Sequence, residues 1–196
     1  MTAERTAAIV AAALVLVSAL GSAPAAAATY EELGDPTVET TVQGSDVFAP
    51  GESRTLTVGL RNTGVTVTSW DGRVSDLAAV IESQGIRPGA ALSTAAQVRA
   101  GDAPLDVRTG RQSVGTVAAD ADARVPVRVE VDENATPGVY RLPVEVQYRY
   151  VETIIVDANR QHVARNAETV TRHVTVRVEP RARRSVAETT GAGPTE

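Results

Sequence analysis

The sequence contains no cysteine and no lysine, and it is poor in aromatic residues, methionine and histidine. Because there is no cysteine, disulfide bonds, thiol catalysis and thiolate metal sites are excluded. Aromatic residues make up only 3% of the chain, so a core must be built mainly from Val, Leu, Ile and Ala. Valine, the commonest of the large apolar residues, favours pleated, half-buried surfaces. A chain of 196 residues with 43% hydrophobic content can form one domain with a core of its own.

The charge of the chain is mildly acidic and is spread along its length. All 19 basic residues are arginines, and 24 acidic residues leave a formal net charge of −5. Nucleic-acid binding requires positive charge concentrated in runs or on one face, and the sequence contains no long basic run. We therefore expect no nucleic acid among the partners of this protein.

Residues 1–28 have the pattern of a secretory signal peptide. Arg5 and the terminal amine supply weak positive charge, and residues 7–20 form an apolar run. Three small residues at 26–28 then predict cleavage after Ala28. The apolar run is short and alanine-rich for a membrane span, but an uncleaved N-terminal anchor is the alternative. The pattern predicts a secreted, extracellular protein at the cell surface, with no membrane span in the mature chain.

The remaining sequence predicts one domain between two polar segments. Residues 29–36 form a short polar lead-in, and residues 37–179 contain the alternating segments expected of a folded domain. Residues 180–196 consist mainly of Arg, Ala, Thr, Gly, Pro and Glu, which cannot bury enough apolar area to fold. We expect this tail to be disordered.

Period-two alternation of apolar and polar residues is the main structural signal in the domain. The strongest alternation runs from Tyr140 to Tyr150, and residues 151–156 either continue it or pair back after a bend. Pro126 lies in another clear strand, where it cannot donate a ladder hydrogen bond, so we expect a sheet edge there. An alanine-rich stretch at 90–100 suggests a single helical turn or a loop. Further strands are expected at 37–42, 54–61, 65–69, 76–81, 105–109, 113–117, 124–131 and 170–178.

This succession of short strands, with no convincing long helix, predicts the fold class. We expect an all-β, immunoglobulin-like antiparallel β-sandwich of about seven to nine strands. Each sheet would bury one face and leave the other face in water.

No residue pattern points to catalysis. His162 and His173 lack the i, i+4 spacing of a zinc site, and no nucleophile elbow or phosphate-binding loop is present. Carboxylates are numerous, but a glycosidase needs two of them at a defined separation inside a cleft, which a small sandwich does not obviously offer. We predict a protein that is not an enzyme and that uses no cofactor or metal. A weak alternative, oxygen ligation of Ca²⁺, would use the carboxylates that flank one strand, namely Asp120, Asp122, Asp132 and Glu133.

Two residues are candidates for contact with glycans. Trp70, the single tryptophan, lies beside a predicted turn and could stack on a sugar ring, or it could close one end of the sandwich as a packing residue. Asn134 begins an Asn-Ala-Thr acceptor pattern for N-glycosylation, which Pro137 would hinder. Turn chemistry alone also explains an asparagine at this position.

Several turn-and-strand motifs resemble those of one known family. They are Pro-Gly-Glu at 50–52, Leu-Thr-Val at 56–58, Asn-Thr-Gly at 62–64, Val-Gly-Thr-Val-Ala at 114–118 and Asn-Ala-Thr-Pro-Gly-Val-Tyr at 134–140. Together they resemble an archaeal S-layer-like domain family, related to the sandwich domains found beside alpha-galactosidases. The resemblance covers most of residues 37–179. It implies an immunoglobulin-like sandwich outside the cell, in cell-envelope proteins of which some are associated with membrane exporters, and it implies no catalytic residues.

The sequence therefore leads to one main expectation about function and one alternative. The main expectation is a non-catalytic structural or protein-interaction module of the cell envelope, with a cell-envelope protein or a membrane exporter as partner. The alternative is a carbohydrate-binding module in which an exposed Trp70 contacts the glycan.

Overall fold

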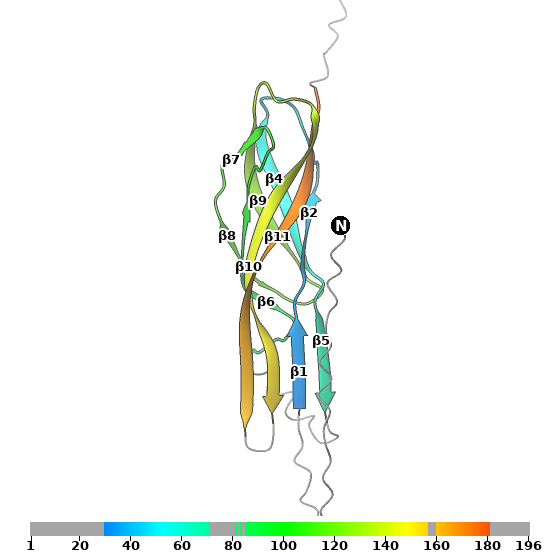
Figure 1. Ribbon diagram of the computed structural model, residues 1–196, viewed down its shortest axis with the longest axis vertical. Helices are drawn as coiled ribbons and strands as arrows, with labels where there is room; N and C mark the ends of the chain where they lie inside the picture. The colour runs from blue at the N-terminus through cyan, green and yellow to red at the C-terminus, as the bar shows by residue number, and fades with distance from the viewer. Residues whose placement is uncertain (1–29, 71–80, 82, 84, 157–159, 181–196) are drawn as a thin grey trace, which may run out of the picture.

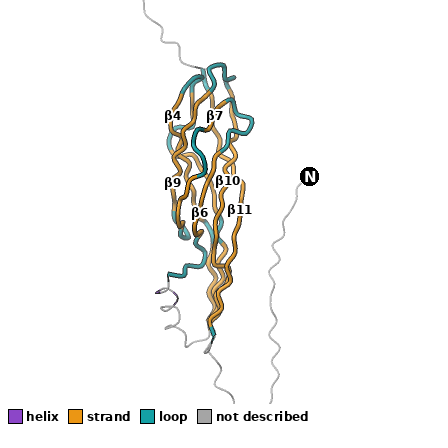
Figure 2. The backbone as a smooth tube through the Cα atoms, turned by 90° about the vertical axis from the view of Figure 1, so that its left-hand side faces the viewer, coloured by secondary structure: helices purple, strands orange, loops and turns teal. Residues whose placement is uncertain are grey.

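The described part of the chain is an elongated sandwich of two β-sheets (Figures 1 and 2). The computed structural model describes residues 30–70, 81, 83, 85–156 and 160–180, and at Trp70 the main chain only. These residues form eleven strands in two mainly antiparallel sheets, which confirms the all-β sandwich. The expected signal peptide at 1–28 and residues 181–196 of the expected tail lie outside the described residues.

The smaller sheet has four strands and the larger sheet has seven. The order in the smaller sheet is β2 (Val38–Gln43), β4 (Ser53–Asn62), β9 (Asp122–Val131) and β7 (Leu105–Val107). The main path of the larger sheet is β3 (Val47–Phe48), β11 (Gln161–Val178), β10 (Gly138–Val156), β1 (Tyr30–Asp35) and β5 (Val65–Trp70). On the same side of β10 as β1, but paired with the earlier residues 144–149, lies β6 (Ala91–Val98). In turn, β6 pairs with β8 (Gln112–Val117). All these pairings are antiparallel except that of β3 with β11, which is parallel.

The core lies between the two sheets and is built from the alternating residues of the long strands. Leu142, Val144 and Val146 of β10 are fully buried, as the alternation predicts. They face the valines at 125, 127, 129 and 131 of β9 in one continuous apolar cluster. Burying a valine or leucine side chain stabilises a fold by roughly 1.5–3 kcal/mol, so these two strands account for much of the driving force.

Two segments differ from their sequence-based expectations. Residues 90–100 were expected to be a helical turn or a loop, but they contain β6, and this prediction is wrong. The small side chains of β6 are buried alternately between β10 and β8, so tertiary pairing overrides the alanine preference for helix. The polar lead-in also differs, because residues 30–35 form β1 within the larger sheet. Of the strand expected at 76–81, only Ile81 lies within the described residues, and its backbone is helical.

The second half of the chain forms longer strands than expected. Residues 151–156 continue the strand that begins at Gly138, so β10 runs for 19 residues with an irregularity in register between Val151 and Thr153. The expected sheet edge at Pro126 is confirmed, because β7 pairs only with residues 129–131 of β9.

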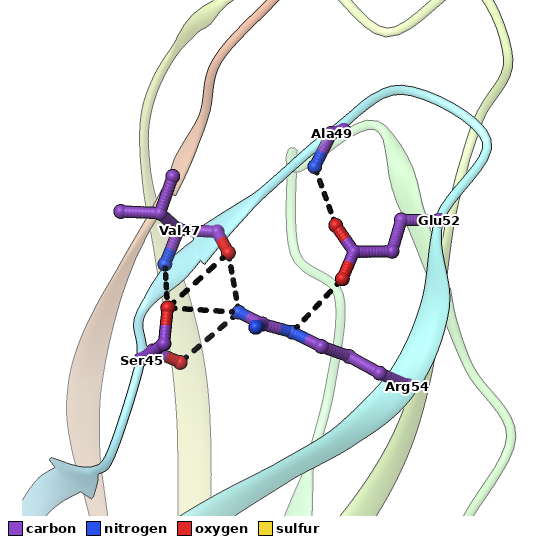
Figure 3. Close-up of polar contacts among 5 residues, drawn as sticks. All are labelled: Ser45, Val47, Ala49, Glu52 and Arg54. Atoms are coloured by element: carbon purple, nitrogen blue, oxygen red, sulfur yellow. Dashed lines mark hydrogen bonds and ion pairs between the residues drawn. The ribbon is translucent and has the colours of Figure 1, made fainter. Parts of the chain in front are cut away.

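One arginine fastens the end of the sandwich where β3 lies beside the last residues of β11 (Figure 3). The Arg54 Nη2 donates to the Ser45 carbonyl oxygen at 3.1 Å and also to the Val47 carbonyl oxygen. Its guanidinium carbon lies 4.0 Å from the centre of the Phe48 ring. The Nε lies 3.4 Å from a carboxylate oxygen of Glu52, which is an ion-pair distance without hydrogen-bond geometry. These contacts hold the β3 segment against β4.

Candidate interaction surface

The larger sheet extends beyond the smaller one at the end opposite β7 (Figure 1). We call this part the extension, and it consists of β1, β5, residues 151–156 of β10 and residues 161–165 of β11. In it Leu33 pairs with Val67 of β5 on one side and with Thr153 of β10 on the other. Since paired residues point to the same face of a sheet, these three side chains form one row across the strands.

The chain crosses between the two sheets twice where the extension begins, once at 36–37 and once at 63–64. The two crossings are in close contact, because a Cβ on Gly64 would lie 2.4 Å from both the Asp35 carbonyl oxygen and the Pro36 Cα. Only glycine permits this approach. Asn62, which is fully buried, joins the crossings by accepting hydrogen bonds from the amides of Thr37 at 3.1 Å and Gly64 at 3.0 Å.

The same asparagine also attaches the crossings to the rest of the molecule. Its Nδ2 donates to the Gly89 carbonyl oxygen at 2.7 Å and to the Val117 carbonyl oxygen at 3.1 Å. All four hydrogen bonds that an asparagine side chain readily makes are therefore satisfied inside the protein. Asn62 thus holds the two crossings, from which the extension begins, against Gly89 and Val117.

One face of the extension is covered by the segment that precedes β6. A Cβ on Gly34 would lie 2.3 Å from the amide nitrogen of Gly89, so the two backbones touch. The Thr66 hydroxyl donates to the Pro88 carbonyl oxygen at 3.2 Å. A second, smaller apolar cluster lies on this face and comprises Tyr30, Ile81, Val151, Ile154 and Val156, with Ile86, Leu92 and Val163 packed against it.

The opposite face of the extension remains open and apolar. Four large apolar side chains stay exposed in the described part of the chain, and three of them are Leu33 (43% exposed), Val67 (57%) and Val65 (62%). With Tyr150 they line a hollow of about 590 Å³. Tyr150 also packs against the main core, so the hollow begins where the covered interior of the sandwich ends.

Carboxylates stand at the edge of this hollow. Asp35 and Glu152 line it together with the apolar side chains, and neither forms an ion pair with a described residue. The pKa of Tyr150 is raised, first by burial and then by the negative charges of Glu152, Glu168 and Asp35. The open face therefore combines an apolar floor with carboxylates that form no ion pair with a described residue.

The outer edge of β5 is the second open feature of the extension. Its residues from Val65 to Ser69 are all exposed, and it pairs with β1 in continuous register over its full length. The strand reads Val-Thr-Val-Thr-Ser-Trp, without charge, proline or glycine. Within the described residues no other strand pairs with its outer edge. A flat, uncharged edge strand of this kind is a template for pairing with another strand.

The residues singled out for glycan contact lie at different places. Trp70 is the last residue of β5, and its main chain pairs with Tyr30, whereas its side chain lies outside what the structure describes. Asn134 is exposed in the turn between β9 and β10, and its glycosylation stays a prediction. The structure does not bring these two residues into one site.

The histidines and acidic residues considered for metal binding are also apart. His162 and His173 are both exposed on β11, separated by roughly 36 Å of extended strand. The two aspartates at 120 and 122 lie at one end of β9, and Asp132 and Glu133 lie at the other end. Among the described residues no three His, Asp or Glu side chains form a group suited to a metal ion. The described part of the chain also has no helix with the length and hydropathy needed to cross a membrane.

The open face and the free edge were not recognised from the sequence. The strand at 65–69 was predicted, but its partner β1 was assigned to a polar lead-in, so Leu33 had no expected place in the fold. The available signal was the uncharged Val-Thr alternation of β5, which is unusual for a strand in which residues 65–69 are all exposed.

No known family matches the sequence of this chain, and no curated protein is significantly similar to it.

Proposed function

We propose that this protein is a non-catalytic protein-interaction module of the immunoglobulin-like class that acts outside the cell, in the cell envelope. The proposal depends mainly on the extension, which projects an apolar face and a strand edge that no other described strand pairs with away from the sandwich. Contiguous exposed apolar surface bordered by polar groups is typical of protein interaction sites.

Two features support the immunoglobulin-like class. The strand orders β2-β4-β9-β7 and β3-β11-β10-β6-β8, with β3 parallel to β11, correspond to the two sheets of that fold. The Tyr140 hydroxyl donates to the Thr136 carbonyl oxygen four residues upstream, at 2.7 Å. A tyrosine at the start of this strand that bonds back to the preceding turn is a recurrent corner in such sandwiches.

Action outside the cell rests on the signal-peptide pattern of residues 1–28. The family resemblance adds a cell-envelope protein or a membrane exporter as the class of partner. The extension is the part of the molecule best suited to contact such a partner.

Site-specific photo-cross-linking on intact cells tests this proposal. A photoreactive amino acid placed at Val65 should yield an adduct with a cell-envelope protein or with a second copy of the chain. The matched control is Val139, an equally exposed valine (65% exposed) that lies on β10 far from the extension. Adducts at both positions alike, or at neither, would contradict an interaction site on the extension.

Carbohydrate binding is the second candidate, and one observation favours it. Trp70 ends the exposed strand β5, which borders the open face. A glycan array probed with the protein and with Trp70→Ala tests the idea directly. Binding that is lost in Trp70→Ala supports it, and an array without any bound glycan removes it.

A further inference from the structure

We propose that the occupant of the β5 edge is β5 of a second copy of this chain, paired antiparallel about a two-fold axis at Val67. This inference rests on the proposed interaction function and names its partner. The pairing would join the two extensions into one continuous eight-stranded sheet.

Every other exposed edge in the described structure is short, irregular, partly covered or charged. The outer edge of β11 pairs with β3 at only two residues, and its remaining part, from 161 to 176, carries Arg165, Glu168 and Arg172. β3 has two residues, β7 has three, and the pairing of β8 with β6 is interrupted by register shifts. The edge of β2 is partly covered, because the Arg172 Nε donates to the Val38 carbonyl oxygen at 2.8 Å and the Thr40 hydroxyl donates to the His173 carbonyl oxygen at 3.5 Å. These are the usual protections of sheet edges against pairing with other chains. β5 has none of them.

The faces of the strand restrict the register of a symmetric pair. In an antiparallel pair, directly opposite residues point to the same face, so a residue of odd number must lie opposite another of odd number. A dyad at Val67 satisfies this condition and places Val67 opposite Val67 of the second copy, with Val65 opposite Ser69 and Thr66 opposite Thr68. If the pairing were shifted by one residue, each valine would lie opposite a polar residue, and the two would have to point to the same face of the sheet although the pleat directs them to opposite faces.

This register continues the apolar row that already crosses the extension. Leu33 pairs with Val67 within one chain, so the dimer would align Leu33, Val67 and their two counterparts at successive strand spacings. The three exposed apolar side chains of each copy would then lie in one patch. Aliphatic cross-strand pairs of this kind contribute roughly 0.2–1 kcal/mol each beyond an alanine pair.

Charge does not oppose the pairing. β5 carries no charged residue, and among the described residues the carboxylates of the neighbouring strand β1 are Glu31, Glu32 and Asp35. The β1 strands of two paired copies would be three strand spacings apart, roughly 14 Å. This exceeds the screening length of about 8 Å at physiological salt, so repulsion between them is weak. A basic partner strand is therefore not required.

Single-cysteine variants test the register, because the chain has no other thiol. A residue on the dyad lies about 4.5–5.5 Å from its counterpart between Cα atoms, within the range that a disulfide bridges. Under mild oxidation by oxidised glutathione, Val67→Cys should form a linked dimer as its main species. Val65→Cys should not, since its two copies would be four residues out of register, roughly 13 Å apart. Val139→Cys reports random collision.

The second measurement is the self-association of the purified protein, after any processing of the chain by the producing cell. Two six-residue strands make an interface below about 1,200 Å², so we expect a dimer at micromolar to millimolar concentration by analytical ultracentrifugation. Val67→Lys places like charges directly opposite and should raise the dimer dissociation constant at least about tenfold. Val139→Lys should leave it unchanged.

The outcomes separate this inference from the proposed function. Equal cross-linking of the three cysteine variants, or a wild-type protein that stays monomeric at millimolar concentration, overturns pairing between copies. If the protein is monomeric but Val65 cross-links to an unlike envelope protein on cells, the proposed function stands and the second copy is excluded. If the protein is monomeric and Val65 gives no photo-adduct on cells, both the pairing between copies and the proposed function are wrong.

Discussion

Asn62 is the residue whose replacement tests the architecture most sharply. It is fully buried and makes four hydrogen bonds, which join both chain crossings to the segment before β6 and to β8. Asn62→Ala removes all of them and leaves their partners behind. We expect the variant to be strongly destabilised.

The magnitude follows from the burial of the four partners. The carbonyl oxygens of Gly89 and Val117 are bonded in buried surroundings, and leaving each without a donor costs about 1–3 kcal/mol. The amides of Thr37 and Gly64 are partly buried, and water can replace part of their lost bonds, at about 0.5–1.5 kcal/mol each. Because such costs are not strictly additive, we expect a loss of about 3–5 kcal/mol in the free energy of unfolding. That is a large share of the roughly 5–15 kcal/mol typical of a domain.

Urea unfolding followed by far-ultraviolet circular dichroism measures this loss. The midpoint should fall while the slope stays the same, since the exposed area on unfolding does not change. Asn166→Ala is the matched control, because Asn166 is exposed on β11 and its replacement should change the free energy by no more than about 0.5 kcal/mol. A loss below about 1 kcal/mol in Asn62→Ala would refute the view that this side chain fastens the extension.

Three further predictions follow from the packing and the titration of single residues. Gly34→Ala should cost about 3 kcal/mol, because its Cβ would overlap backbone atoms, whereas Gly110→Ala, with no atom within 4 Å, should be neutral or slightly stabilising. Arg54→Lys should lower the free energy of unfolding in urea by about 1–2 kcal/mol, since lysine cannot donate in the same geometry to the two carbonyl oxygens that Arg54 contacts. Arg61→Lys, at an exposed ion pair, should lower it by less than about 0.5 kcal/mol. Burial, followed by a hydrogen bond to a carboxylate, raises the pKa of Tyr148 above its ordinary value, so the fold favours the neutral phenol. The stability that this gives is complete below about pH 10 and is lost as the pH rises further, and Tyr148→Phe should flatten the fall of the urea midpoint above pH 10.

Each of these predictions can fail in a definite way. Equal stability of Gly34→Ala and Gly110→Ala would mean that the backbones of β1 and of the covering segment do not touch. Indistinguishable losses in the two arginine variants would remove the role given to Arg54 in fastening β3. An unchanged alkaline slope in Tyr148→Phe would assign the pH dependence to another group, of which Tyr30, with its pKa raised to about 12, is the next candidate.

Strands whose own residues form the core could be predicted from the sequence. β9 and the first part of β10 alternate valine or leucine with polar residues, and every one of the valines from 125 to 131 is buried as expected. The edge at Pro126 followed from the missing amide hydrogen. In these strands local pattern and tertiary position agree, so the fold class followed from the pattern.

The extension could not be predicted in the same way, because its strands depend on distant partners. β1 reads as polar, and it becomes a strand only through its pairing with β10 and β5. β6 is rich in small residues, which carry little periodic signal until β8 and β10 enclose them. Asn62 stands in an Asn-Thr-Gly turn motif, and its burial depends on contacts with Thr37, Gly89 and Val117, which are remote from it in sequence.

Amide hydrogen exchange of Val65–Trp70 at several protein concentrations tests most directly whether β5 is the interaction strand. The outward amides of an unpaired edge exchange rapidly, and pairing with a second copy protects them. We predict that protection of this segment rises with concentration in the wild type and not in Val67→Lys, while the β9 amides stay unchanged. Rapid, concentration-independent exchange, or strong protection already in the dilute monomer, would contradict the account.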